Sequence, residues 1–108
     1  MSKEVVYVSG RISASTPEEI EDNIRLGMKK GAELAKEGFA PIVPHGNSYG
    51  WNRHGSFDWR EYMRVDLELV KRSDSVYMMS NWRESKGARI EERFARLLGK
   101  RVVYEGKP

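Results

Sequence analysis

Short β-rich runs and amphipathic helical segments alternate along almost the whole chain, and this alternation constrains the fold more than any other feature. The runs with strand character cover residues 5–9, 39–43, 75–79 and 101–104. Helical patterns extend from Pro17 to about Gly38, from about Asp58 to Arg72, and over residues 88–98. This alternation predicts an α/β domain over residues 1–108, with a four-stranded, mostly parallel sheet and helices on both faces. Because four strands leave exposed edges and helix faces, we expect a homo-oligomer, a dimer or larger.

Local signals predict where the helices begin and end. Thr16 is placed to be an N-cap before Pro17, with Glu19 completing a capping box. Gly38 and Gly99 are typical of the residues that end helices. The apolar and small residues predicted for the inner side of the first helix are Ile20, Ile24, Met28, Gly31, Ala32 and Ala35.

The composition restricts the chemistry and the partners of the chain. Its 108 residues include no cysteine, which removes thiol catalysis and cysteine-based zinc sites and favours a reducing, cytoplasmic setting. The net charge of +3 is too small to predict a nucleic-acid partner. Glutamates also interrupt the arginines between Arg83 and Arg101, as on a solvated helix face. No apolar run is long enough to predict a membrane partner. His45 and His54 alone are weak evidence for a metal, so we expect neither a metal nor a cofactor.

The polar turn after the third predicted strand is the strongest candidate for a ligand site. Residues 81–91 lead from a strand into a helix, so the helix begins at the carboxyl end of the sheet, where open α/β sheets bind ligands. Ser85 and Gly87 supply a hydroxyl group and unobstructed backbone amides that suit an anion. Trp82 lies in the same turn and is a further candidate for ligand contact.

Two carboxylates are predicted to face inward from helices. The neighbours of Glu91 three and four residues away are small or apolar, whereas Glu92 has arginines around it and is expected to form solvated ion pairs. Asp66 falls inside the apolar face of its own helix. A carboxylate against apolar surface is costly unless it is paired or used in chemistry. The alternative for Glu91 is a purely structural role, as a negative charge that stabilises the first turns of its helix. The alternative for Asp66 is that it caps a neighbouring loop.

Other polar groups are predicted to converge on these carboxylates, because the strand-to-helix turns of a parallel sheet emerge at one edge. Ser9, Gly10 and Arg11 end the first strand, and His45 follows the second. Tyr7 alternates with Ser9, so both face the same side of the sheet. Paired carboxylates beside an anion-binding turn favour cleavage of a glycosidic bond near a phosphate.

The segment 46–58 is rich in glycine, asparagine and aromatic residues. A connection with this composition is rarely a simple link between elements. We expect either a lid with a stacking surface or a subunit interface, and the sequence favours neither.

Several motifs resemble the nucleoside 2-deoxyribosyltransferase-like family, which includes 2'-deoxynucleoside 5'-phosphate N-hydrolases. The motif Tyr7-Val8-Ser9-Gly10-Arg11 ends the first strand, 38–45 spans the second, 66–74 precedes the third, and the most specific motif is Ser85-x-Gly87 with Glu91 six residues after the serine. The chain is similar above all to a short bacterial and phage branch of that family. The resemblance covers nearly the whole chain and implies a flavodoxin-like three-layer sandwich and a homo-oligomer.

The resemblance also implies roles for individual residues. Glu91 is the expected nucleophile on the sugar C1', Tyr7 the group that holds this carboxylate ionised and aimed, and Asp66 a proton relay near the base or a sugar hydroxyl. Gly10, Arg11, Ser85 and Gly87 are expected around a 5'-hydroxyl or 5'-phosphate. The implied activity is an N-glycosidase that acts on a nucleoside or (deoxy)nucleoside 5'-monophosphate.

Three departures from the family pattern keep other functions open. Lys86 and Arg89 stand where small or apolar residues are common, and the segment 46–58 has no clear counterpart in the family. The asparagine that transferases draw from a partner subunit is not evident. The alternatives are a non-catalytic nucleotide-binding or sensor module, a nucleoside deoxyribosyltransferase, and a glycohydrolase of an NAD-like dinucleotide.

Overall fold

A computed structural model describes residues 2–106 of the chain. The strands are β1 (Val5–Ser9), β2 (Ala40–Ile42), β3 (Ser75–Met78) and β4 (Arg101–Tyr104). The α-helices are α1 (Pro17–Lys36), α2 (Pro44–Asn47), α3 (Trp59–Arg72) and α4 (Lys86–Leu97). Two 3-10 helices complete the structure: η1 (Trp51–Arg53) and η2 (Trp82–Glu84).

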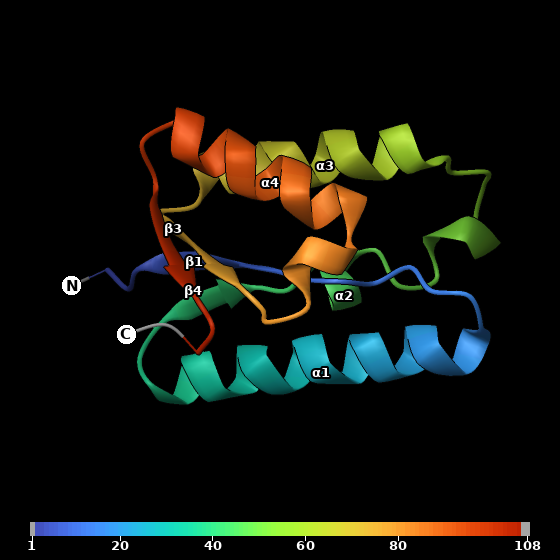
Figure 1. Cartoon of the computed structure of the whole chain (residues 1–108), viewed down its shortest axis with the longest axis horizontal. Coiled ribbons are helices and arrows are strands. Elements are labelled where there is room, and N and C mark those ends of the chain that lie inside the picture. Colours follow the sequence, from blue (N-terminus) through green and yellow to red (C-terminus); the bar gives the residue numbers. More distant parts are fainter. Residues whose placement is uncertain (1, 107–108) are drawn as a thin grey trace.

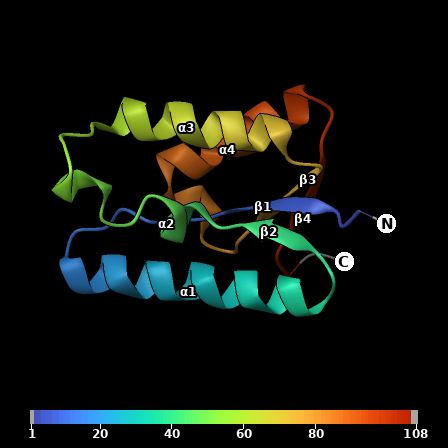
Figure 2. The ribbon, with the colours of Figure 1, turned by 180° about the vertical axis from the view of Figure 1, so that it is seen from behind.

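The fold is a flavodoxin-like three-layer sandwich, as predicted. The strands lie in the order β2-β1-β3-β4, and all three pairings are parallel. Helix α1 covers one face of the sheet, and α3 and α4 cover the other (Figure 1). The view from behind shows α2 directly after β2, between the sheet and α1 (Figure 2). The carboxyl ends of the strands therefore meet at one edge, where α2, η1 and the start of α4 also lie.

Each face of the sheet carries its own apolar cluster. Val6 and Val8 of β1 pack with Leu34 of α1, whereas Tyr7 of the same strand packs with Val70 of α3 and residues of α4. This division follows from the alternation of side chains along a strand. It also directs the alternating polar residue, Ser9, toward the face that α3 and α4 cover.

The helix starts are held by side-chain caps. Thr16 Oγ1 accepts a hydrogen bond from the Glu19 backbone N–H at 3.2 Å, as predicted, but the Glu19 carboxylate accepts from the Thr16 hydroxyl. A full reciprocal capping box occurs instead at α3, between Asp58 and Glu61. Ser85 caps α4, which begins at Lys86, two residues earlier than predicted.

The buried side of α1 differs from the predicted side. Asn23, Gly27, Gly31 and Leu34 are buried, whereas Met28, Ala32 and Ala35 are exposed, contrary to the prediction. The glycines determine this orientation, because a Cβ on Gly27 would lie 2.5 Å from the His45 ring and one on Gly31 would lie 2.5 Å from Val43. Helix α1 therefore packs closely against the chain that leaves β2.

The region after β2 also departs from the prediction. Strand β2 is three residues long, and Pro44 opens a short helix where the sequence suggested a strand end. Within the predicted loop, Gly50 at φ 82° precedes η1.

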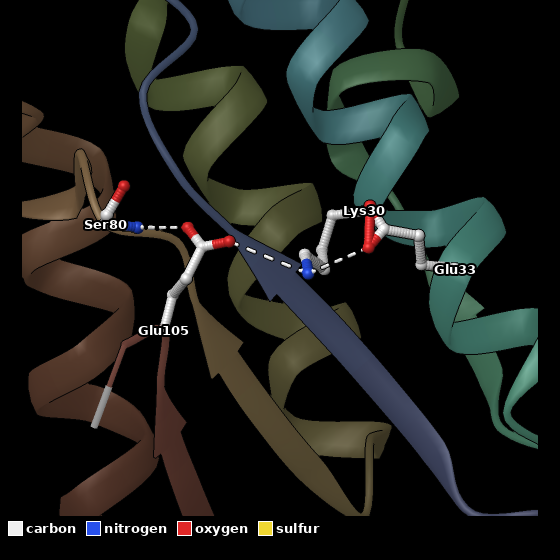
Figure 3. A network of polar contacts seen from close by, with 4 residues as sticks. All are labelled: Lys30, Glu33, Ser80 and Glu105. Atoms are coloured by element: carbon white, nitrogen blue, oxygen red, sulfur yellow. Dashed lines mark hydrogen bonds and ion pairs between the residues drawn. The ribbon is translucent and has the colours of Figure 1, made fainter. Parts of the chain in front are cut away.

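A polar network joins three elements on the side of the sheet that faces α1 (Figure 3). Glu105, just after β4, accepts a hydrogen bond from the Ser80 backbone N–H at 2.8 Å and lies 3.6 Å from Lys30 Nζ. Lys30 also pairs with Glu33 at 3.3 Å. The network links α1 to the ends of β3 and β4.

No helix within the described residues is long and apolar enough to cross a bilayer.

Candidate active site

A cavity of about 450 Å³ opens at the carboxyl edge of the sheet. One wall consists of the first half of α1 and the segment that contains α2 and η1, and the opposite wall consists of α3 and the start of α4. Its size falls in the range of ordinary small-molecule sites. The predicted site residues on its walls are Gly10, His45, Asp66, Ser85, Gly87 and Glu91.

Glu91 is a buried carboxyl group on the cavity wall. Its side chain is 95% buried, because α4 directs it toward β1. The Tyr7 hydroxyl donates to Oε2 at 3.0 Å and the Ser9 hydroxyl donates to Oε1 at 2.7 Å. Both donors are fully buried behind the carboxylate and do not line the cavity. Tyr7 and Ser9 therefore fix the orientation of Glu91, and only Glu91 faces the cavity.

The surroundings of Glu91 make its carboxyl group difficult to ionise. Burial raises its pKa from 4.5 to about 8, and the charge of Asp66 adds to this rise. The hydrogen bonds from Ser9 and Tyr7 oppose the shift without cancelling it. The hydrogen bond expected from Tyr7 is therefore present and favours the ionised carboxylate, but loss of hydration outweighs the two donors.

Asp66 reaches the same cavity from α3. Burial raises its pKa from 3.8 to about 6, so it titrates below Glu91. Its charge also raises the pKa of Tyr7, which shows that the three groups share one electrostatic environment. Two carboxyl groups with separated pKa values are typical of acid–base sites.

The turn for which anion binding was predicted lies at the start of α4, on the cavity wall. Ser85 Oγ accepts from the Ala88 backbone N–H at 3.1 Å, so its hydroxyl proton is free to be donated to a ligand. A Cβ on Gly87 would lie 3.2 Å from Met63 Sδ, so glycine fits the narrow space there. The ammonium group of Lys86 lies 4.7 Å from the centre of the Trp59 ring, at the same end of the cavity.

Besides Ser9, two more residues that were predicted to bind the substrate, Arg11 and Trp82, lie outside the cavity wall. The Arg11 guanidinium donates to the Ser13 backbone oxygen, and its backbone N–H donates to Asn81. Trp82 packs on Tyr104 with ring centres 5.8 Å apart, beside a second hollow of about 380 Å³.

Glu92 is more buried than predicted, and Arg89, one of the departures from the family pattern, lies away from the cavity. Glu92 is 93% buried rather than solvated, because Tyr104 of β4 donates to its carboxylate. Its predicted pairing with an arginine is present, through Arg96 at 2.8 Å. Arg89 donates to the Arg83 backbone oxygen and does not line the cavity.

The segment 46–58 forms part of the wall, and sequence reasoning did not identify its contributing residues. Ser48, Tyr49, Asn52 and Arg53 line the cavity from this segment. Its other aromatic residues, Trp51 and Phe57, cluster with Tyr62 of α3, with ring centres 5.5–6.4 Å apart. The unusual composition of the segment was the only available signal. Ile20 and Ile24 of the first turns of α1 were missed because they carried only a core signal, and Glu21 carried no signal for a site.

His45 is buried against α1 at the edge of the cavity. It is 98% buried, and burial lowers its pKa to about 4 although the Arg11 backbone favours the protonated ring. The contact with the Arg11 backbone falls short of normal hydrogen-bond geometry, so Nδ1 and Nε2 are the only buried side-chain nitrogen or oxygen atoms among residues 2–106 without a hydrogen bond of normal geometry. Within the same range, no group of three or more His, Cys, Asp or Glu side chains is arranged to hold a metal ion.

Comparisons with known proteins agree with this architecture. A 2-deoxyribosyltransferase from the psychrotolerant bacterium Bacillus psychrosaccharolyticus has a similar fold, with a TM-score of 0.71 and 22% sequence identity. The similarity covers 96% of this chain and 75% of the other. No curated protein matches the sequence. Residues 4–104 match the family described as Domain of unknown function (DUF4406), and the chain therefore belongs to this family.

Proposed function

We propose that this protein is an N-glycosidase that releases the base from a nucleoside or (deoxy)nucleoside 5'-monophosphate, with Glu91 as nucleophile. The observation that carries the proposal is the placement of Glu91, whose two oxygens are held by Tyr7 and Ser9 at the wall of a ligand-sized cavity. A carboxylate aimed by two donors is pre-organised for attack on a bound carbon atom. The fold supports the proposal, because the similar bacterial enzyme is described as a biocatalyst for the synthesis of nucleosides.

The proposed reaction has two steps. The ionised Glu91 attacks C1' of the sugar, a C–O bond forms, and the glycosidic C–N bond breaks with its electron pair leaving on the base. Asp66, which is ionised wherever Glu91 is ionised, holds a sugar hydroxyl or relays a proton from a water molecule to the departing base. A second water molecule then attacks C1' and gives up its proton to Asp66 or to solvent, the ester to Glu91 breaks, and the sugar or sugar phosphate is released. Ser85 and the amides around Gly87 are placed to bind the 5'-substituent.

Base release from a panel of nucleosides and 5'-monophosphates, measured by chromatography, tests the proposal. We expect Glu91→Gln to abolish release while circular dichroism shows an intact fold. Glu92→Gln is the matched control, because Glu92 is the next residue of α4 but lies beside the second hollow. Full release by Glu91→Gln would refute the proposal.

One observation favours a second candidate function, a nucleotide-binding or sensor module without turnover. With its pKa raised to about 8, Glu91 is mainly protonated at pH 7, and a protonated acid does not attack C1'. A sensor would be stabilised against heat by a nucleotide and would leave that nucleotide intact after long incubation. Free base in the same sample would exclude this function.

A further inference from the structure

Two asparagines hold one turn of the cavity wall, the turn of residues 10–13 that leads from β1 toward α1. Asn81 Oδ1 accepts a hydrogen bond from the Arg11 backbone N–H at 3.0 Å. Asn23 Nδ2 donates to the Ile12 backbone oxygen at 3.1 Å. Asn81 belongs to the chain after β3 and Asn23 to the first half of α1, so two different elements hold consecutive residues of the turn.

Neither asparagine makes the contact that its own position favours. Asn81 directly precedes η2, where an asparagine side chain commonly caps a helix, but it makes no cap hydrogen bond. Asn23 lies within α1, where asparagine is a poor helix former, and it is only 9% exposed. A buried amide needs a hydrogen-bond partner, and the turn supplies one. Both side chains therefore serve the turn rather than the elements that carry them.

The turn begins in close contact with the chain after β3. The Ser9 backbone oxygen accepts from the Met79 backbone N–H at 2.8 Å. A Cβ on Gly10 would lie 2.7 Å from Met79 Sδ and 3.1 Å from Asn81 Oδ1, so a side chain there would displace both neighbours. The contact with Asn81 therefore fixes the turn where it leaves the sheet.

We propose that Asn81 and Asn23 are positioning residues that hold the turn 10–13 in the conformation that binds the ligand. Gly10, Ile12 and Ser13 of the turn line the cavity, and neither asparagine does. The asparagines therefore act through the turn. Without them the turn would sample other conformations, and the apparent affinity would fall with the population of the competent one. This role rests on the proposed function, because it takes a nucleotide as the ligand.

The two asparagines should affect binding rather than the reacting carboxylate. Tyr7 and Ser9, which orient Glu91, belong to β1 and are held in register by β3. They precede the turn that the asparagines hold. We therefore expect removal of either asparagine to raise KM and to leave kcat and the pH inflection of Glu91 unchanged.

Substitution by aspartate distinguishes the two positions, because a carboxylate accepts hydrogen bonds but does not donate them. Asn81→Asp keeps the acceptor for the Arg11 N–H, whereas Asn23→Asp places a carboxylate against the Ile12 oxygen. Calorimetric titration with a 2'-deoxynucleoside 5'-monophosphate measures the effect, in a background that carries Glu91→Gln so that the ligand is not consumed. We expect Asn23→Asp and Asn81→Leu to weaken binding about fivefold to tenfold, and Asn81→Asp to stay within about twofold of the unsubstituted background.

Asn47→Asp is the matched control for the added charge. Asn47 is an exposed residue of α2 that does not line the cavity. We expect this variant to bind the nucleotide with unchanged affinity. A loss of affinity in Asn81→Asp as large as that in Asn81→Leu, or unchanged affinity in both Asn81→Leu and Asn23→Asp, would overturn the proposal.

Amide hydrogen exchange of the ligand-free wild-type protein provides a readout that does not depend on folding of a variant. We expect the Arg11 N–H to exchange slowly, because Asn81 accepts from it. The same amide should exchange faster in Asn81→Leu and slowly in Asn81→Asp. An unprotected Arg11 amide in the wild type would overturn the proposal, and so would absence of any nucleotide binding.

The outcome is separable from that of the proposed function. Nucleotide binding that depends on Asn81 and Asn23 but gives no free base would retain the positioning role and refute the glycosidase. Base release with an unchanged KM in Asn81→Leu and Asn23→Asp would retain the glycosidase and refute the positioning role.

Discussion

Glu91 combines two properties that work against each other: its neighbours orient it, and its burial suppresses its charge. Tyr7 and Ser9 each donate to one oxygen, but loss of hydration raises its pKa to about 8. The reactive form is the minor form at neutral pH. Activity that depends on Glu91 must therefore follow its ionisation.

The pH dependence of base release follows directly. We expect kcat/KM to rise with pH as Glu91 ionises, with an inflection near pH 8. A pH–rate profile of the free enzyme measures this inflection. An activity that is already maximal at pH 6 would show that Glu91 is not the ionising nucleophile.

The same shift predicts how stability depends on pH. Between pH 4.5 and about 8 the folded chain keeps a proton on Glu91 that the unfolded chain has lost, so the free energy of unfolding falls as pH rises. Asp66 acts in the same direction between pH 3.8 and about 6. We expect Glu91→Gln to flatten this dependence above pH 6 and to raise the melting temperature at pH 8. A wild-type protein whose stability rises from pH 6 to pH 8 would contradict the assignment.

The sequence allowed part of this site to be predicted. Glu91 was predicted to face inward because its helical neighbours are small or apolar, and the structure places it so. The same reasoning failed for Glu92, because the group that covers it, Tyr104, lies on another element. Side-chain neighbours from distant strands cannot be read from helical spacing.

At the scale of elements, the long periodic segments were predictable and the short ones were not. Strands β1 and β4 have the predicted bounds, and α3 begins within one residue of the predicted start. Helices α2 and η1 were missed, because four or three residues are too few to show periodicity. The predicted inner side of α1 was wrong in part, because Gly27 carries no apolar signal although a Cβ there would lie 2.5 Å from the His45 ring; Gly31 was predicted to be buried, and it is.

The caps of α1 and α4 provide a prediction at this scale. Ser85→Ala and Thr16→Ala each remove the acceptor of an N-terminal backbone N–H, so each should cost about 1 kcal/mol of stability. Only Ser85 lines the cavity. We therefore expect similar urea midpoints for the two variants but weaker nucleotide binding only in Ser85→Ala. Equal binding in both would show that the Ser85 hydroxyl does not contact the ligand.

At the scale of the whole molecule, several large apolar side chains are exposed near the cavity mouth. Tyr49, Phe57 and Trp59 are 54%, 38% and 43% exposed. We propose that they are buried between subunits of a homo-oligomer, as the family resemblance implies. The chain order of the elements predicted the sheet but could not reveal which surfaces remain uncovered, because exposure depends on the complete packing.

Light scattering after size exclusion measures the assembly. We expect a dimer or larger species, and a shift toward the monomer in Phe57→Asp. Leu97→Asp serves as the control. Leu97 is also an exposed apolar residue, at 76%, but it lies at the last residue of α4, whereas the cavity lies at the first turn of that helix. A wild-type monomer at all concentrations would contradict the proposed assembly.

The most direct test of the central claim is the mass of the protein during turnover. Wild-type protein mixed with a 2'-deoxynucleoside 5'-monophosphate and quenched in acid should carry the mass of one sugar phosphate, located by peptide mapping on Glu91. Glu91→Gln should carry none. Release of base by a wild-type protein in which residue 91 never carries the sugar would contradict the account.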